Sequence, residues 1–443
     1  MISVSSVAFL VYAGLTISGI IILLVFYLAW PIRRALPTES DISTARGPFW
    51  YLYYGHKYLR PVEQPGKGSN LALYFAEMRM FSVHSSIKSR KMKRVSLGLT
   101  GDLMYRRDCI GAGGEKLWEL AGKDLFDADF CIGNLEFAVN DKNIIEKIVD
   151  YSAPSAGATP LLIAPGFGRF QAVSVANNHI NDSGWDGIIS TCRYLDENSF
   201  IHFGANRTRD EQNNFPIITV NGLRIALLGY SFTHNNHQLD QEHAYGLNLI
   251  RFNALHDRDY DPSLIHSHIE LAKQRGAQYI TASCHWGVEF ECYPPDRLVR
   301  RARALMEAGI DCIIGHHPHI LNPVELYTAT DGRQCVCFYS LGSITTYALI
   351  RPFQHLAQIA RLELEYSDEK TVYVRNVFMT PTYHLITKEN GIRANRILPL
   401  LRTAEILKSG MRPEYISKRK AKIIFEIEKF YRRHFMQRCL IHR

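Results

Sequence analysis

The sequence predicts an α/β fold in which helices flank β-sheets, preceded by an N-terminal transmembrane helix. From Val95 onward, short β-branched or apolar runs alternate with helical patterns of about a dozen residues, which is typical of α/β domains. Before that, the chain is almost wholly apolar or small from Val4 to Trp30. In addition, five strand-like runs end in Asp, Glu, Asn or His, as expected where a sheet carries a ligand site.

The N-terminal apolar segment is long enough to cross a bilayer, which needs about 20 residues. A cleaved signal peptide is the alternative, but it would begin with basic residues and carry a shorter apolar stretch. Here the first charged side chain is Arg33, after the apolar stretch has ended. We therefore expect residues 1–32 to form an uncleaved, single-pass anchor that holds the protein at a membrane.

The net charge of +8 is distributed unevenly along the chain. Residues 31–94 and residues 402–443 each hold 12 Lys and Arg against 4 Asp and Glu, whereas residues 95–401 carry a net charge of −8. Basic residues beside a span favour the cytoplasmic side and can hold a domain on anionic lipid. An acidic polymer would also be attracted by such flanks, and composition leaves both alternatives open. The basic runs lack interleaved aromatic residues, so we expect no nucleic acid partner.

Cysteine usage agrees with a reducing environment. The chain has nine cysteines, and none of them has the CxxC spacing of a structural zinc site. Several lie in apolar, strand-like runs, as buried thiols do. This pattern weakly favours a cytoplasmic domain.

These patterns predict that the chain has four segments. After the anchor, we expect a basic linker with one short helix near Leu71–Phe81, a main α/β domain and a basic helical extension. The predicted boundaries are 1–32 for the anchor, 33–94 for the linker, 95–383 for the main domain and 384–443 for the extension.

Within the main domain, two hairpins and three helices stand out. Asn221-Gly222 separates two strand-like runs and is a strong hairpin signal. A second hairpin is expected between Ala360–Glu365 and Thr371–Phe378. Helices are expected at Gly187–Asn198, Leu264–Arg275 and Asp296–Ala308. The stretch 231–262 is too long for a simple connection, so we expect it to order over the site as a lid.

The five polar strand endings predict one shared site. They carry Asp102, Glu136, Asn178-His179, His285 and the three histidines of the GHHPH run, His316, His317 and His319. Each alone has an ordinary explanation, such as a turn, a helix cap or a buried core histidine. Together they indicate a metal site at the carboxyl ends of the strands. Mixed carboxylate, amide and imidazole groups suit a divalent ion such as Mn²⁺, Fe²⁺ or Zn²⁺.

Neighbours of these residues are candidates for catalysis and substrate binding. His179 adjoins Asn178 and is well placed to protonate a leaving group. Trp286 and Glu289 belong to the HWGVE run that contains His285, and His316 belongs to GHHPH. We expect His316, Trp286 and Glu289 to contact the substrate.

Six motifs give the chain a family resemblance. GDLM, GNLE, ANNH, HWGVE, GHHPH and YSLGS occur in the order and spacing of the CapA-type poly-gamma-glutamate capsule biosynthesis proteins, from about Val95 to about Tyr383. That family resembles the calcineurin-like metallophosphoesterases. The resemblance implies two stacked mixed β-sheets flanked by helices, with His179 as the proton donor. It implies metal contacts from Asp102, Glu136, Asn178, His285, His317 and His319.

The resemblance also implies a membrane-anchored role in making, exporting or attaching an anionic γ-linked glutamate polymer. The implied partners are an anionic polymer or a phosphorylated substrate, the membrane, and membrane-embedded synthase or exporter subunits. Such proteins are expected outside the membrane, whereas the basic flanks favour the inside. The side of the membrane is therefore left open.

Three residues depart from the pattern. Met104 stands where metallophosphoesterases have the His of Asp-x-His, Glu136 stands near the expected bridging Asp, and Ser343 replaces the Asn of YSLGN. Two hypotheses follow. The first is a metal-dependent hydrolase or transferase in polymer assembly, and the second is a non-catalytic membrane subunit that stabilises a synthase or exporter.

Overall fold

The structure is a computed structural model. It describes residues 48–77, 92–107, 114–142, 144–145, 152–235, 237–346, 352–367, 371–389, 391–436 and 441–442. Within these ranges, no helix is both long enough and apolar enough to cross a bilayer. The anchor predicted at residues 1–32 lies outside the described residues.

A mixed, nine-stranded sheet forms one layer of the main domain, and β1 lies near its middle. On one side of β1, the neighbouring strands β2, β7 and β8 pair in parallel. On the other side, β16, β17 and β18 pair antiparallel, each with the strand before it in the sheet. Short β15 and β19 pair with β1 and β17. The strands are β1 Lys93–Leu103, β2 Phe130–Leu135, β7 Ala172–Ser174, β8 Ile201–Phe203, β15 Ser343–Thr345, β16 Leu356–Tyr366, β17 Val372–Glu389, β18 Ile392–Pro399 and β19 Ile441–His442.

A second mixed sheet has six strands in the order β13-β14-β12-β11-β10-β9. Its central strands are parallel, and each edge strand runs antiparallel to its neighbour. The strands are β9 Ile217–Val220, β10 Leu223–Ser231, β11 Tyr279–His285, β12 Cys312–His316, β13 Val324–Thr328 and β14 Gln334–Phe338. Two short two-stranded pairs complete the strands: β3 Ala138–Val139 with β4 Ser152–Ala153, and β5 Ile163–Ala164 with β6 Gly168–Arg169.

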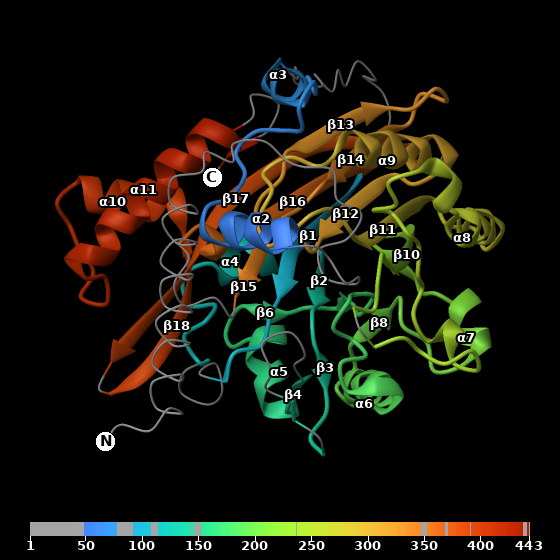
Figure 1. The fold of residues 1–443 in the computed structure, drawn as a ribbon, viewed down its shortest axis with the longest axis horizontal. Helices are drawn as coiled ribbons and strands as arrows, with labels where there is room; N and C mark the ends of the chain where they lie inside the picture. The colour runs from blue at the N-terminus through green and yellow to red at the C-terminus, as the bar shows by residue number, and fades with distance from the viewer. Residues whose placement is uncertain are drawn as a thin grey trace, which may run out of the picture.

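The two sheets pack face to face, because alternate residues of their strands are apolar toward one another. Leu97 and Leu99 of β1 share a buried cluster with Ile225 and Leu227 of β10 and with Phe338 of β14. Helices cover the two outer faces (Figure 1). On the nine-stranded side these are α4 Gly122–Phe126, α5 Ser155–Leu162 and α6 Gly184–Glu197, and on the six-stranded side α8 Ser263–Gln274 and α9 Asp296–Ala308. The predicted α/β fold with stacked mixed sheets flanked by helices is confirmed.

Most of the predicted elements are present. The first hairpin is β9–β10, and its turn residues Asn221 and Gly222 have φ angles of 49° and 95°, as the tight turn requires. The second hairpin is β16–β17. The three predicted helices are α6, α8 and α9, and the short helix expected near Leu71–Phe81 is α3 Leu71–Glu77. Short α7 Arg209–Asn213 and the 3₁₀ turns Ala244–Gly246, Asp257–Asp259 and Pro352–His355 connect the larger elements.

Part of the segment expected to be a basic linker packs on the main domain. Helix α2 Pro48–Leu59 brings the buried Tyr53 hydroxyl to donate to Glu291 Oε1 at 2.7 Å, and the buried Lys57 ammonium lies 3.6 Å from the same oxygen. In α3, the Tyr74 hydroxyl donates to Glu325 Oε1 at 2.8 Å. These contacts join residues 48–77 to the six-stranded side of the fold.

The C-terminal part begins within the sheet. The boundary predicted after residue 383 falls inside β17, and β18 continues the sheet to Pro399. Two helices follow, α10 Leu400–Lys408 and α11 Lys418–His434, with the side chain of Ser417 capping α11. Their apolar faces pack on Tyr383, Leu385 and Leu398 of the β17–β18 ribbon. The helical character expected for this region is present, but it follows a β-ribbon.

Candidate metal centre

Two glycines allow the strands to approach closely where the site is built. A Cβ atom on Gly101 would lie 1.8 Å from the carbonyl oxygen of Gly342, and one on Gly315 would lie 2.1 Å from that of Tyr339. Neither approach is compatible with a side chain. Gly101 precedes Asp102 in β1, and Gly315 precedes His316 in β12. Both close approaches of the backbone therefore bring polar residues to the same site.

The nine-stranded sheet delivers carboxylates and amides. Asp102 is the residue before the last in β1 and Glu136 follows β2 directly, and both side chains are fully buried. Asn134, the residue of β2 that pairs with Asp102, donates from its amide to Asp102 Oδ1 at 2.9 Å. Asn177 donates to Asn134 Oδ1 at 3.4 Å and to the carbonyl of Leu135 at 2.8 Å, which links β2 to the loop after β7.

The six-stranded sheet delivers imidazoles and one carboxylate. His285 ends β11 and His316 ends β12, while His317, His319 and Glu289 lie in the loops that follow. His317 and His319 have positive φ angles of 95° and 52°, which are uncommon for residues with a side chain. Backbone strain of this kind is often found at functional sites. The backbone N–H of His317 donates to Asp102 Oδ2 at 3.1 Å and helps to hold the loop in place.

The two sets of side chains meet between the sheets. One carboxylate oxygen of Asp102 lies 3.1 Å from His316 Nδ1, and the other lies 3.4 Å from His319 Nδ1. Glu136 Oε1 lies 3.5 Å from His285 Nε2 and 3.6 Å from His319 Nε2. Glu289 Oε1 also lies 3.6 Å from His319 Nε2. Three overlapping triplets place their ligand atoms within 4.8 Å of one another: Glu136/His285/His317, Glu289/His317/His319 and Asp102/Glu136/His319.

Crowding and burial perturb the acid–base equilibria of the cluster. Burial, and then the charge of nearby carboxylates with Asp102 first among them, raises the pKa of Glu136 well above its usual range. Burial and then the charge of His317 lower the pKa of His285 well below its usual range. Burial also acts to raise the pKa of Asp102, but hydrogen bonds to His316 and His319 outweigh it and hold that pKa well below normal.

These residues fit a divalent metal ion. Without a cation, buried carboxylates repel one another, and this repulsion adds to the effect of burial in raising the pKa of Glu136. The buried His285 Nε2 and Asn178 Oδ1 make no hydrogen bond within the described part of the chain. Buried polar atoms normally have a partner, and both atoms are common metal ligands. Carboxylate, amide and neutral imidazole form the donor set expected for Mn²⁺, Fe²⁺ or Zn²⁺.

A histidine–aspartate pair lies in the loop that follows β7. His179 Nδ1 is 2.7 Å from Asp182 Oδ2, and the backbone N–H of His179 donates to Asn177 Oδ1 at 3.1 Å. The carboxylate fixes the ring orientation and favours a proton on Nδ1. His179 is therefore held like a general acid or base, in a loop that also connects to Asn134 and the cluster.

Part of the predicted lid lies against the site. Phe232 packs on the rings of His317 and His285, with centroid distances of 4.7 and 6.5 Å. Asn178 Nδ2 donates to Asn235 Oδ1, and Asn235 Nδ2 donates to the carbonyl of Asn178, both at 3.1 Å. The start of segment 231–262 therefore contacts both halves of the cluster.

Most of the predicted site residues are brought together, but Trp286 is not among them. Its fully buried indole N–H donates to the carbonyl of Tyr339 at 3.1 Å, and its ring packs on Phe252 and Tyr339 in the core behind the six-stranded sheet. Adjacent residues at a strand end face opposite sides, so His285 faces the site while Trp286 faces the core. This position argues against the predicted substrate contact of Trp286. Glu289 and His316, also predicted to contact substrate, lie within the cluster itself.

Several residues around the cluster were not predicted. Asn134 lies within the GNLE motif, Asp182 follows His179 by three positions, and the Ser343 hydroxyl lies 3.0 Å from His319 Nδ1. The signal for Asp182 was its spacing from His179, which allows a local side-chain pair. Met104 is buried with its backbone N–H donating to Thr345 Oγ1 at 2.9 Å, so an apolar side chain occupies that position.

Comparisons with known proteins support the motif-based resemblance. Residues 96–347 match the model of the family described as bacterial capsule synthesis protein PGA_cap. The chain is 26% identical over 266 residues to the capsule biosynthesis protein CapA of Bacillus anthracis, which covers 58% of this chain and 61% of the relative. It is 27% identical over 314 residues to the PGA biosynthesis protein CapA of Bacillus subtilis, which covers 66% of this chain and 77% of the relative.

A solved structure, the calcineurin-like phosphoesterase YfkN from Bacillus subtilis, matches 77% of this chain and 98% of that chain with a TM-score of 0.37 and 13% identity. The family match covers more than half of the chain and includes all of the cluster residues. The chain thus belongs to the bacterial capsule synthesis protein family PGA_cap.

Proposed function

We propose that this protein is a metal-dependent hydrolase or transferase that acts in the synthesis, export or attachment of a capsule polymer. The observation that carries the proposal is the buried cluster of carboxylates and imidazoles, in which three overlapping triplets each place their ligand atoms within 4.8 Å of one another. Such a cluster is costly to bury unless a cation or a hydrogen-bond network stabilises it. We infer that Asp102, Glu136, Asn178, His285, His317 and His319 hold the metal, with Glu289 as a further candidate ligand.

A bound divalent ion would supply a polarised substrate oxygen and a water of lowered pKa. The protein supplies the rest of the chemistry. His179, oriented by Asp182, donates a proton to the leaving group as its bond breaks. Phe232 and the inter-sheet core limit the access of bulk water, which strengthens the electrostatic contacts of the cluster.

The biological role comes from the relatives. Their names refer to capsule biosynthesis and to PGA biosynthesis, and the family is described by bacterial capsule synthesis. This chain spans 61% of the length of the Bacillus anthracis relative, so the activity of the whole protein is part of the proposal. The proposed substrate is an anionic polymer of γ-linked glutamate or a phosphorylated precursor.

We also propose that the protein is anchored to a membrane by the apolar segment Val4–Trp30. The basic residues that follow it would contact anionic lipid or the acidic polymer. Partners at the membrane would be embedded synthase or exporter subunits.

A second function, a non-catalytic subunit of such a complex, is favoured by one observation. Met104 is buried where a metallophosphoesterase would have a ligand histidine, so one ligand of a two-metal site is missing. In that case the cluster would keep a metal for structure or ligand binding, and His179 would have no chemical task.

Complementation separates the two functions. Capsule-forming cells that lack this protein would receive the wild-type gene, His179→Ala or the matched control His243→Ala, whose ring contacts Trp185 and Asp240 instead of the cluster. The catalytic proposal predicts that His179→Ala abolishes polymer output at normal protein abundance, while the control restores it. Full output with His179→Ala would favour the non-catalytic subunit.

A further inference from the structure

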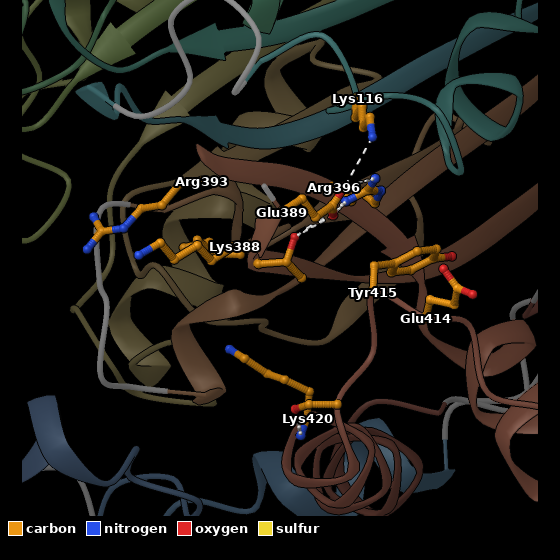
Figure 2. Close-up of a pocket in the computed structure, with 11 residues that line it drawn as sticks. Lys116, Lys388, Glu389, Arg393, Arg396, Glu414, Tyr415 and Lys420 are labelled. Carbon is orange, nitrogen blue, oxygen red and sulfur yellow. Dashed lines mark hydrogen bonds and ion pairs between the residues drawn. The ribbon is translucent and has the colours of Figure 1, made fainter. Parts of the chain in front are cut away.

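A polar cavity lies at the ribbon formed by β17 and β18. Its volume is about 850 Å³, and it is lined by the ribbon, by Lys116 and by the start of α11 (Figure 2). Five cationic side chains and two carboxylates surround it, namely Lys116, Lys388, Arg393, Arg396, Lys420, Glu389 and Glu414. The cavity shares no lining residue with the metal cluster, and most of its wall lies beyond residues 96–347.

One of the carboxylates is already neutralised. Glu389 pairs with Arg396 through both oxygens and with Lys116 at 3.0 Å. The hydrogen bonds from Arg396 outweigh burial and lower the pKa of Glu389 to about 2. Arg396 is buried, and its guanidinium also lies 4.5 Å from the centre of the Tyr415 ring. This pair therefore forms a rigid floor for the cavity.

Two of the remaining cations, Lys388 and Lys420, line the cavity as well. Lys388 is exposed and Lys420 is half-buried, and neither makes an ion pair within the described residues. In Figure 2, the Lys420 side chain extends from α11 toward the ribbon that carries Lys388 and Arg393. Partial burial and the adjacent charge of Arg419 lower the pKa of Lys420, so an anion beside its ammonium group would be favourable.

The size and lining of the cavity select the class of ligand. A single small ion would fill only a small part of it, since one water occupies about 30 Å³ in the liquid. Nucleic acid would need an open aromatic face for stacking, whereas the ring of Tyr415 faces Arg396. Cationic side chains distributed around a cavity of this volume suit an acidic oligomer with carboxylates spaced along its chain.

We propose that this cavity binds an acidic oligomer, such as a segment of γ-linked glutamate chain, through Lys388, Arg393 and Lys420. The inference rests on the proposed role in polymer assembly and adds a holding site apart from the metal cluster. Such a site would keep a growing or departing chain attached to the protein between reaction steps.

Binding of a short, fluorescently labelled oligomer of γ-linked glutamate to the full-length protein tests this inference. We expect Lys388→Ala/Lys420→Ala to weaken binding about tenfold or more, because two charge contacts are lost. The matched control is Lys422→Ala/Lys429→Ala, which removes the same charge from exposed positions of α11. It should stay within about twofold of wild type, and added salt should weaken binding to wild type.

Equal binding by wild type and both double variants would overturn the inference, as would no binding to wild type. Binding of inorganic phosphate or of anionic lipid vesicles in place of the oligomer would also overturn it. Metal content, measured on the same samples, reports separately on the proposed catalytic function. Metal-free protein with oligomer binding that is sensitive to Lys388 and Lys420 would uphold this inference and contradict the proposed catalysis.

Discussion

The two sheets make different contributions to the candidate metal centre. The nine-stranded sheet supplies Asp102, Glu136 and the Asn178-His179 loop, whereas the six-stranded sheet supplies His285, His317 and His319. Neither sheet alone holds a complete set of ligands, since the closest contacts run between the sheets, as from Asp102 to His316 at 3.1 Å. The apolar layer between the sheets therefore determines the geometry of the site as directly as the ligands do.

The largest expected effect is the loss of turnover in a His179 variant, which distinguishes the proposed proton donor from the proposed metal ligands. His179 belongs to the nine-stranded side and pairs with Asp182. In His179→Ala, turnover of a chromogenic phosphodiester should fall by about 10²- to 10⁴-fold, the usual contribution of a general acid. Metal content should remain that of wild type. Loss of metal in this variant would place His179 among the ligands, and unchanged turnover would remove it from catalysis.

A variant of the apolar layer tests whether the sheets depend on each other. Phe338 of β14 is fully buried between them, so Phe338→Ala should lower the free energy of unfolding by about 3–5 kcal/mol. Metal binding should weaken at the same time, because the two halves of the cluster lose their fixed separation. Chemical denaturation with and without metal measures both effects. The exposed Leu255→Ala should change stability by less than about 0.5 kcal/mol, and unaltered metal binding by folded Phe338→Ala would show that the halves are independent.

A buried histidine outside the site gives a smaller, pH-dependent effect. His268 of α8 lies 2.8 Å from the Tyr230 hydroxyl, and burial lowers its pKa to about 4. Its folded pKa is below its unfolded value of about 6.5, so its contribution to stability is complete above pH 6.5 and is lost as the pH falls toward 4. The loss amounts to roughly 2–4 kcal/mol.

The His268→Gln variant should reduce the slope of unfolding free energy between pH 6.5 and 4, as measured by denaturation at each pH. His266→Gln, on the exposed face of the same helix, is the matched control and should keep the wild-type slope. An unchanged slope in His268→Gln would mean that other groups produce the acid sensitivity.

The smallest expected effect is on metal affinity, in variants of Ser343, which contacts the proposed ligand His319. The Ser343 hydroxyl lies 3.0 Å from His319 Nδ1, so Ser343→Ala should weaken metal binding by about tenfold, the lower end of the range for such partners. Metal titration with a competing chelator measures the change. Ser343→Asn should bind metal nearly as well as wild type, because an amide can make the same contact. Equal affinity of Ser343→Ala and wild type would show that this hydrogen bond does not orient His319.

Sequence patterns predicted the fold class, both hairpins and three of the helices, because alternation and turn residues are local signals. They also predicted which polar residues gather, since Asp102, Glu136, His285 and the GHHPH histidines all follow strands. The position of Trp286 was missed because sequence does not tell which of two adjacent residues faces the core. The packing of α2 on Glu291 was missed as well, because it depends on a contact more than 200 residues away in the sequence.

The metal content of the purified full-length protein, measured by elemental analysis beside His317→Ala/His319→Ala, tests the central claim most directly. We predict near-stoichiometric Mn, Fe or Zn in the wild type and its loss in the double variant, because each of the three ligand triplets contains His317, His319 or both. A folded wild-type protein that contains no metal and takes up none on addition of these ions would contradict the account. Equal metal in both proteins would mean that the ion binds elsewhere.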